Sequence, residues 1–166
     1  MTIHNSPQVR GLPPIVGGRP RILILGNAPS VLSLAKQEYY GNPQNAFWRI
    51  TGELFGFAAD APYAERTAAL ISRGVAVWDA LALCRRPGSL DSAVERDSMV
   101  ANDFPTFFAA HPDIERVYFN GAAAEANFRR LATGTAHLHY ARLPSTSPAH
   151  TVGFSTKLAA WRVIAD

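Results

Sequence analysis

The sequence lacks most features of disulfide-stabilised, metal-binding and membrane proteins. Its single cysteine, Cys84, has no partner for an internal disulfide, and no Cys/His spacing typical of zinc or iron–sulfur sites occurs. No apolar run approaches the ~20 residues that span a bilayer, and the first residues lack the apolar stretch of a secretory signal. We therefore expect a cytoplasmic protein that holds no metal and does not contact a membrane.

A strong excess of one charge is also missing. Lys and Arg number 16 against 13 Asp and Glu, which gives a net charge of +3 at pH 7, and 48% of the residues are hydrophobic. A balance this mildly basic permits contact with a polyanion over a small footprint without requiring it. The 166 residues fit one domain with its own core.

Four apolar segments predict the strands of a parallel sheet. The first, Arg21–Gly26, has four consecutive Ile and Leu residues before a glycine, which is typical of a strand buried on both faces. Three further segments predict the remaining strands, at residues 75–78, 117–119 and 137–142. Residues 1–20 hold four of the twelve prolines and predict an irregular arm, packed on a single domain of residues 21–166.

Apolar residues at helical spacing fill the gaps between these strands. The sets are Phe47, Ile50 and Leu54; Ala64, Ala68 and Ile71; Ala124, Phe128 and Leu131; and Phe154, Leu158 and Trp161. Asn102-Asp103 before Pro105 predicts the capped start of a further helix. Strands that alternate with helices imply right-handed crossovers. The predicted fold is therefore a three-layer α/β/α sandwich around a central, mainly parallel four-stranded sheet.

Three loops follow predicted strands at the edge of the sheet where ligands bind in such folds. They are Gly26–Ser30, Asn120–Gly121 and Leu143–His150. The first also suits a plain strand-to-helix turn with Ser30 as N-cap, and it lacks the Gly-Lys-Ser/Thr ending of a phosphate-binding loop. We expect the fold to bring the three loops together.

Leu143–His150 contains two prolines and three hydroxyl side chains. Prolines stiffen a loop, while small hydroxyl residues and backbone N–H groups suit close approach to a phosphate backbone. The segment therefore predicts either a clamp for one nucleic-acid strand or an ordinary loop that leads into the last helix.

The segment Tyr39–Trp48 combines aromatic and amide side chains at unusual density. It reads Tyr-Tyr-Gly-Asn-Pro-Gln-Asn-Ala-Phe-Trp. Buried amides need hydrogen-bond partners or destabilise the fold, so Asn45 among these apolar groups suggests a functional role. The structural alternative is a loop that Phe47-Trp48 anchors in the core.

Together and in this order, these motifs resemble the uracil-DNA glycosylase superfamily. The pattern is a strand that ends in a Gly-x-x-Pro loop, an Asn-x-Phe-Trp element, and a Pro-Ser-rich loop before the last helix. Tyr39–Trp48 with Leu143–Ala149 resembles its hypoxanthine (deoxyinosine) branch in particular. Residues 77–79, 88–92 and 119–121 fit the same branch, and the resemblance runs from about Gly11 to the C-terminus.

The resemblance implies a catalytic asparagine, for which the chain offers three candidates. The asparagine important in the hypoxanthine branch maps onto Asn45, whose side-chain oxygen would position the attacking water. Asn42 stands where that branch often has histidine, and Asn27 where serine is more usual. The mismatch-specific branch has its catalytic asparagine directly before the proline of the first loop, where this chain has Ala28.

The resemblance also implies residues that bind the base and the DNA strand. Backbone N–H groups of residues 27–30 would bind a carbonyl oxygen of the departing base, on which an aromatic ring would stack. The candidates for base binding are Gly26, Ala28, Pro29, Ser30, Tyr40, Phe47, Asp79 and Asn120. An N-cap role suits Asp79 equally well. The candidates for holding the strand are Ser145, Thr146, Ser147, Pro148 and His150.

The implied activity is hydrolysis of the N-glycosidic bond of a deaminated base flipped out of double- or single-stranded DNA. Hydrolysis needs only water, so no cofactor is expected. The three loops contain no lysine that would form a Schiff base, and Lys36 and Lys157 fit surface positions on helices. The prediction is a monomeric, monofunctional enzyme that leaves an abasic site.

Other activities stay open at this point. The same fold would equally serve an enzyme for uracil or for G·T and G·U mismatches. A non-catalytic domain would recognise damaged DNA or nucleotides without releasing a base. A hydrolase with Ser30 or Ser147 as nucleophile is disfavoured, because neither serine lies in a Gly-x-Ser-x-Gly elbow and no Asp/His pair is evident.

Overall fold

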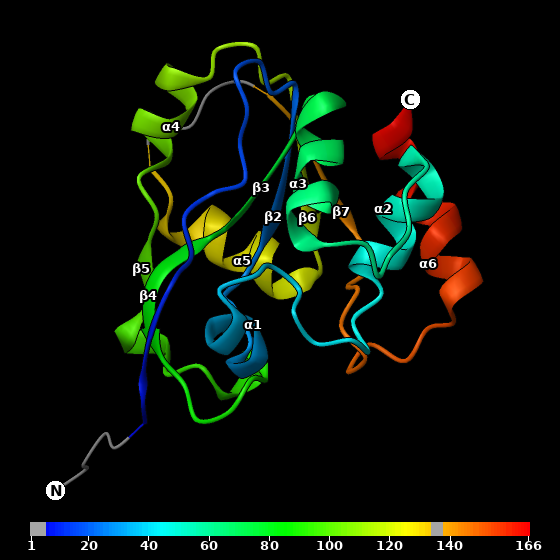
Figure 1. The fold of residues 1–166 in the computed structure, drawn as a ribbon. Helices are drawn as coiled ribbons and strands as arrows, with labels where there is room; N and C mark the ends of the chain where they lie inside the picture. Colours follow the sequence, from blue (N-terminus) through cyan, green and yellow to red (C-terminus); the bar gives the residue numbers. More distant parts are fainter. Residues whose placement is uncertain (1–5, 134–137) are drawn as a thin grey trace, which may run out of the picture.

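A parallel sheet forms the centre of the protein in the computed structural model, which describes residues 6–133 and 138–166. Its strand order is β3-β2-β6-β7 (Figure 1). The strands are β2 (Ile22–Gly26), β3 (Val75–Asp79), β6 (Arg116–Asn120) and β7 (His139–Leu143). All neighbours pair in parallel, which confirms the predicted four-stranded sheet. The predicted bounds differ by one or two residues, and His137 of the fourth segment lies outside the described residues.

Helices cover both faces of this sheet (Figure 1). Those that periodicity predicted are α2 (Phe47–Phe55), α3 (Tyr63–Ser72), α5 (Ala122–Leu131) and α6 (Phe154–Trp161). The predicted capped helix is α4 (Phe104–Ala110), where the Asp103 carboxylate accepts the Thr106 N–H at 3.2 Å. Ser30 caps the short helix α1 (Val31–Lys36) through the Ser33 N–H at 3.1 Å. No helix in the described ranges has the length and apolar character needed to cross a bilayer.

The side chains of β2 alternate between two separate cores. Ile22 and Ile24 pack in the core that α2, α3 and α6 complete. Leu23 and Leu25 pack on the opposite face, in the core that α4 and α5 complete. Because all of β2 is buried, its sequence is a continuous apolar run instead of an alternating one. The three-layer arrangement is therefore confirmed.

A small antiparallel sheet begins where β3 ends. Its strands are β1 (Gln8–Arg10), β4 (Leu81–Arg85) and β5 (Val100–Ala101), in the order β1-β4-β5. The prediction of an irregular N-terminal arm is therefore wrong in part, because β1 pairs with β4 and Ile15 bridges to Val77. Only Val9 of β1 is buried, so this three-residue strand has no apolar pattern to recognise. Residues 1–5 of the arm lie outside the described part.

The parallel strands direct their carboxyl ends to one edge of the sheet. β2 leads into the loop at residues 26–30, β6 into Gly121, and β7 into the loop that precedes α6. β3 turns directly into β4 alongside the first loop, and the Ala80 N–H donates to the Gly26 carbonyl at 2.8 Å. The fold thus places the three predicted loops at a common edge.

Candidate active site

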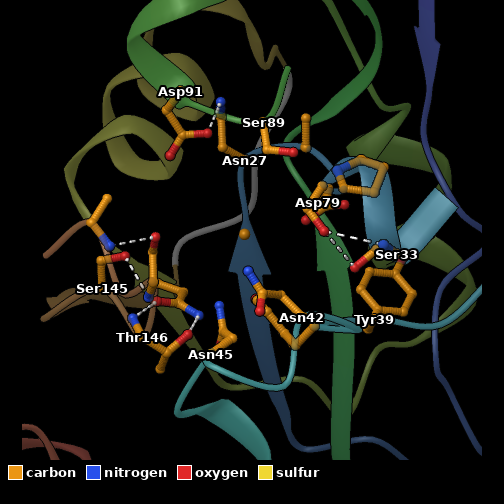
Figure 2. A pocket seen from close by; sticks show the side chains of 18 of the residues that line it. Asn27, Ser33, Tyr39, Asn42, Asn45, Asp79, Ser89, Asp91, Ser145 and Thr146 are labelled. Carbon is orange, nitrogen blue, oxygen red and sulfur yellow. Dashed lines mark hydrogen bonds between the residues drawn. The ribbon is translucent and has the colours of Figure 1, made fainter. Parts of the chain in front are cut away.

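A cavity of about 210 Å³ lies at this edge and is lined by segments from six parts of the chain. Figure 2 shows the side chains that surround it. All of the predicted site residues line it except two. The predicted residues in the lining are Gly26, Asn27, Ala28, Pro29, Ser30, Tyr40, Asn42, Asn45, Asp79, Asn120, Ser145, Thr146, Ser147 and Pro148. The fold therefore assembles one site from loops that lie far apart in sequence.

Phe47 and His150 are the two exceptions. Phe47 is fully buried, so the prediction that it stacks on a base is wrong. Its ring instead packs behind the Tyr40 ring, with centroids 4.2 Å apart. His150 is exposed on the loop that follows β7, and its N–H donates to the Ser147 carbonyl at 3.0 Å. Its contact with DNA stays a prediction.

Asn27 is buried and held from two sides. Its Oδ1 accepts the Asn127 side-chain N–H from α5 at 2.8 Å. Its Nδ2 donates to Asp91 Oδ1 at 3.0 Å (Figure 2). These bonds join the loop after β2 to α5 and to the segment after β4. Since Oδ1 and Nδ2 are both hydrogen-bonded within the fold, the main role of Asn27 is to hold the wall of the cavity together.

Asn120 and Thr146 form a second buried polar pair. Asn120 Nδ2 donates to Thr146 Oγ1 at 2.9 Å, while the Thr146 N–H donates to Asn120 Oδ1 at 2.9 Å. The Thr146 carbonyl also accepts the Ala46 N–H at 2.9 Å. The pair fixes the loop after β7 to the end of β6 and to the start of α2. Thr146 therefore directs its side chain inward, toward Asn120.

Asn42 and Asn45 line the cavity on the side away from Asn27 and Asp91 (Figure 2). Asn42 Oδ1 accepts the Gln44 N–H at 3.0 Å and shapes the turn. Asn45 Oδ1 accepts the Phe47 N–H at 2.9 Å, which orients the amide at the start of α2. A carbonyl oxygen has two lone pairs, so Asn45 Oδ1 keeps one acceptor site for a further group.

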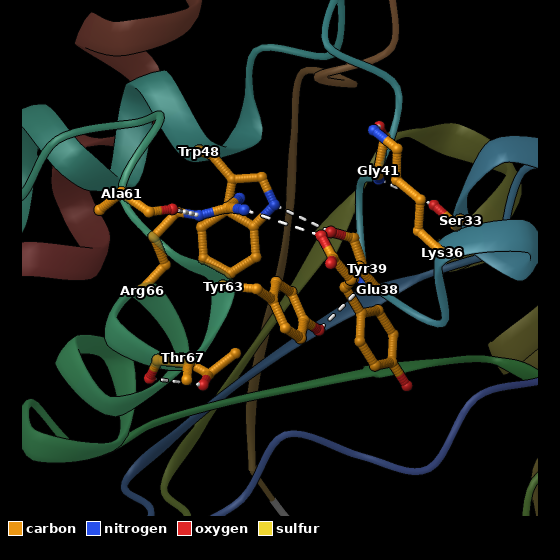
Figure 3. Close-up of polar contacts among 11 residues, drawn as sticks. Ser33, Lys36, Glu38, Tyr39, Gly41, Trp48, Ala61, Tyr63, Arg66 and Thr67 are labelled. Carbon is orange, nitrogen blue, oxygen red and sulfur yellow. Dashed lines mark hydrogen bonds and ion pairs between the residues drawn. The ribbon is translucent and has the colours of Figure 1, made fainter.

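Tyr40 has backbone dihedral φ +53°, in the left-handed region that bulky residues rarely adopt. Its neighbour Tyr39 is fixed on both sides (Figure 3): its N–H donates to the Tyr63 hydroxyl at 3.0 Å, and its carbonyl accepts the Trp48 indole N–H at 2.8 Å. Lys36 donates to the Gly41 carbonyl at 2.8 Å. Strained backbone of this kind persists where its surroundings over-determine it, often at functional sites.

Asp79 and Tyr40 bring two unpaired oxygens to the floor of the cavity. The Asp79 side chain is 3% exposed. Its Oδ2 and the Tyr40 hydroxyl have no partner in hydrogen-bond geometry within the described residues. A Cβ atom on Gly26 would lie 2.5 Å from Asp79 Oδ1 and 2.9 Å from the Tyr40 hydroxyl. Glycine is therefore required at position 26 to make room for both.

The environment of Asp79 favours its neutral form. Burial raises the pKa of Asp79 to about 7, the Asp91 carboxylate adds to the rise, and the Arg86 guanidinium partly offsets it. Burial and the Asp79 carboxylate also raise the pKa of Tyr40, an effect that the Asn120 amide reduces. The alternative N-cap role for Asp79 is wrong, because the chain passes from Asp79 directly into β4.

This sequence and fold also match known proteins. The family model described as the uracil DNA glycosylase superfamily matches residues 13–164. The chain belongs to this superfamily. A protein named hypoxanthine DNA glycosylase from Methanosarcina acetivorans is 32% identical over 156 residues, which cover 93% of this chain and 96% of that protein. A protein of the same name from Methanosarcina barkeri is 33% identical over 113 residues, or 68% and 70% of the two chains.

A solved structure shows the superfamily fold directly. It is a solution NMR structure from Methanosarcina acetivorans described as a candidate uracil DNA glycosylase. It superimposes with a TM-score of 0.79 at 31% identity, and covers 95% of this chain and 96% of its own. The activity that these relatives support is that of a DNA glycosylase, a hydrolase that acts on DNA.

Arg86 supports the site but was not among the residues that we predicted from the sequence. Its side chain is 1% exposed. Nη2 donates to the Pro29 carbonyl and Nε to the Gly88 carbonyl, both at 2.6 Å. Arg86 therefore ties the first loop to the segment that carries Ser89, Leu90 and Asp91, which also line the cavity. The only signals in the sequence were the Arg85-Arg86 pair and the likeness of residues 88–92 to the hypoxanthine branch.

Lys157 corrects another expectation. It was predicted on the surface of a helix, yet it is buried, and its Nζ donates to the Ser147 carbonyl at 3.1 Å. From the same helix, the Trp161 indole N–H donates to the Pro144 carbonyl at 2.9 Å. α6 thus supports the Pro-Ser-rich loop of the glycosylase from behind.

Proposed function

We propose that the protein removes hypoxanthine from deoxyinosine in DNA by hydrolysis and leaves an abasic site. The observation that carries the proposal is the pair of unpartnered polar groups, Asp79 and Tyr40, buried at the cavity floor. A ligand that fills the cavity must satisfy these groups, since an unpaired buried polar group costs about 1–3 kcal/mol. The names of the two Methanosarcina relatives support the same base.

The lactam edge of hypoxanthine complements a neutral Asp79. The base presents an N1–H donor beside the O6 acceptor. A protonated carboxyl group presents a hydroxyl donor beside a carbonyl acceptor, so the two form a pair of hydrogen bonds. A pKa of about 7 keeps a large share of Asp79 in this form near neutral pH. Tyr40 supplies a ring face at the cavity and a hydroxyl for a further polar atom of the purine.

Asn45 is proposed to position the attacking water. Its Oδ1 is oriented by the Phe47 N–H and retains an acceptor site. Asn27 is less suited, because its side-chain amide is engaged by Asn127 and Asp91. An amide is a weak base, so the role of Asn45 is orientation and electrostatic stabilisation of the water, not full proton removal.

The first loop is proposed to stabilise the departing base. Ala28 and Ser30 line the cavity, and their backbone N–H groups make no hydrogen bond to any described residue. Donors aimed at a developing negative charge in a site with little water are a strong source of rate enhancement. These two groups are the proposed partners of the purine as its glycosidic bond breaks.

The loop after β7 is proposed to hold the DNA strand beside the flipped nucleotide. Ser147 N–H donates to Ser145 Oγ at 3.1 Å and Ala149 N–H to Ser147 Oγ at 3.2 Å, which makes two tight turns. Lys157 and Asn120 fix this loop from within through the bonds described above. A rigid chain of small residues suits close contact with phosphates, and a single copy of the protein suffices for it.

The test is base release from a duplex with one deoxyinosine, beside matched duplexes with uracil or a G·T mismatch. Uracil is the second candidate, because its N3–H and adjacent carbonyl form the same lactam edge. Hypoxanthine release, with strand cleavage only after alkali, supports the proposal. Release of uracil alone would show that the enzyme acts on uracil instead of hypoxanthine. Tight binding without release of any base would show a non-catalytic DNA-binding protein.

A further inference from the structure

Arg86 brings a positive charge into the interior of the protein without an ion pair. Arginine keeps its charge in proteins, and Arg86 is 1% exposed. Its guanidinium makes no ion pair with a carboxylate of the described residues, and Nη1 has no hydrogen-bond partner among them. Burial of a charge is unfavourable unless the charge is paired. A neutral donor would also tie two carbonyl groups together, so a structural tie alone does not account for the charge.

Both hydrogen bonds of Arg86 end on peptide groups that border the cavity. Nη2 donates to the Pro29 carbonyl and Nε to the Gly88 carbonyl, both at 2.6 Å. The N–H groups of these two peptide groups belong to the next residues, Ser30 and Ser89, which line the cavity. Neither N–H makes a hydrogen bond to a described residue. One guanidinium thus binds two carbonyl groups whose N–H partners are available as donors.

The geometry of the peptide bond sets the direction of these two donors. A trans peptide group carries its C=O and its N–H on opposite sides, and the described chain has no cis peptide bond. Because the two carbonyl groups face Arg86, the Ser30 and Ser89 N–H groups are directed away from it. Arg86 does not line the cavity, whereas Ser30 and Ser89 do. The two peptide groups therefore stand between the guanidinium and the cavity.

The charge of Arg86 also acts on other residues of the cavity. Burial raises the pKa of Asp79 and the pKa of Asp91, two residues of the lining, and Arg86 opposes this rise at both. A cation bound to a carbonyl oxygen polarises the whole peptide group and strengthens its N–H as a donor. The Ser30 and Ser89 N–H groups are therefore stronger donors than ordinary backbone N–H groups.

We propose that Arg86 acts on the reaction through these two peptide groups, and that the Ser30 and Ser89 N–H groups stabilise the negative charge on the departing base. Donors fixed in this way need no rearrangement as the charge develops. The inference rests on the proposed function, in which the first loop stabilises the departing base. It adds Ser89 and the charge of Arg86 to that role.

Lys157 provides a matched control within the same protein. It is also buried, and its Nζ donates to the Ser147 carbonyl at 3.1 Å. The next residue is Pro148, which has no backbone N–H. The charge of Lys157 has no donor to strengthen on this peptide group, so Lys157 supports its loop without acting on the base.

The experiment measures single-turnover release of hypoxanthine and of 8-azahypoxanthine from duplexes that differ in this base alone. Both bases present the same lactam edge, but the triazole ring makes 8-azahypoxanthine the better leaving group, which needs less stabilisation. Arg86→Gln keeps a neutral donor and removes the charge, so it should lower hypoxanthine release about tenfold or more and 8-azahypoxanthine release about threefold or less. Arg86→Lys keeps the charge and should release both bases within about threefold of the wild-type rates. Lys157→Gln should change both rates by the same factor.

A variant with citrulline at position 86 isolates the charge. Citrulline keeps the shape of arginine and both donated hydrogen bonds, so this variant should behave as Arg86→Gln does, and it replaces Arg86→Gln if a thermal melt shows that Arg86→Gln does not fold. Equal losses on the two bases without the charge would overturn the proposal and leave Arg86 as a structural tie. A loss in Arg86→Lys as large as that in Arg86→Gln would do the same.

A second measurement reads the polarisation without catalysis. The ¹⁵N amide signals of Ser30 and Ser89 should shift upfield when citrulline removes the charge, and should stay in place in Lys157→Gln. Unmoved signals in the citrulline variant would overturn the proposal. If the wild-type protein releases no hypoxanthine, the proposed function is refuted instead. Uracil and 5-fluorouracil, the better leaving group of the two, then replace the purines in the same comparison.

Discussion

Two groups of buried polar side chains meet at the cavity, and they differ in whether the protein satisfies them. The wall group, Asn27, Asn120 and Thr146, is hydrogen-bonded within the fold. The floor group, Asp79 and Tyr40, keeps an oxygen each without a partner among the described residues. Because unpaired burial is costly, the wall group reads as scaffold and the floor group as ligand-binding.

Asn45 is intermediate between the two groups, because its Oδ1 accepts one hydrogen bond within the fold and keeps a second acceptor site. Its substitution should have the largest effect on the rate of base release. We expect Asn45→Ala to lower the rate of base release by about 100-fold or more, since the water loses its acceptor. Single-turnover release from the deoxyinosine duplex measures this effect, and a thermal melt checks that α2 remains folded. Asn45→Asp keeps an oxygen both for the Phe47 N–H and for water, so it should retain most of the rate. Equal loss in both variants would show that the oxygen is not the group that acts.

The next largest effect should be a dependence of base release on pH, which arises from Asp79. Its pKa is raised to about 7, so the neutral form predominates below pH 7 and the carboxylate above it. If the neutral form binds the lactam edge, base release should fall about tenfold between pH 6 and pH 8, as the neutral fraction does.

Asp79→Asn provides the matched control for this profile. Its amide offers a donor and an acceptor that do not titrate, so release should continue with little change across the same pH range. Asp79→Ala should be slow at every pH. A profile for Asp79→Asn that falls like that of the wild-type protein would assign the pH dependence to another group.

The wall group should instead affect stability. Asn27→Ala leaves the buried Asn127 amide and the Asp91 carboxylate without their partner, so the free energy of unfolding should fall by about 2 kcal/mol. Urea denaturation measures this change. Asn42→Ala is the comparison, because it removes a single local bond near the surface and should cost about 0.5 kcal/mol or less. Similar losses in the two variants would contradict the distinction between scaffold and turn.

The sequence located the residues of both groups better than it located the contacts that they make. Apolar runs located the strands, and so the loops after Gly26, Asn120 and Leu143 followed from the rule for parallel sheets. Asp79 and Tyr40 were identified as base-binding candidates through the resemblance to the hypoxanthine branch. Apolar runs and short motifs are local patterns, which can be recognised in a single sequence.

The wall depends on contacts between distant residues, which have no local pattern. Asn27 bonds to Asp91 and to Asn127, 64 and 100 residues away. Arg86 and Lys157 were missed for a related reason. Long charged side chains are usually exposed, and only the surrounding carbonyl groups show that these two are buried supports.

The adjacent tyrosines provide the smallest and most direct test of the comparison. Tyr39 belongs with the wall, because its hydroxyl donates to the Leu12 carbonyl at 3.1 Å, while the Tyr40 hydroxyl is unpaired. Tyr39→Phe should therefore lower the free energy of unfolding by about 1 kcal/mol. Tyr40→Phe should leave it unchanged or slightly higher, yet weaken base release from deoxyinosine several-fold by removing a group that the substrate satisfies. Since both changes delete one oxygen from neighbouring rings, a loss of stability in Tyr40→Phe without a loss of activity would mean that the floor is scaffold as well.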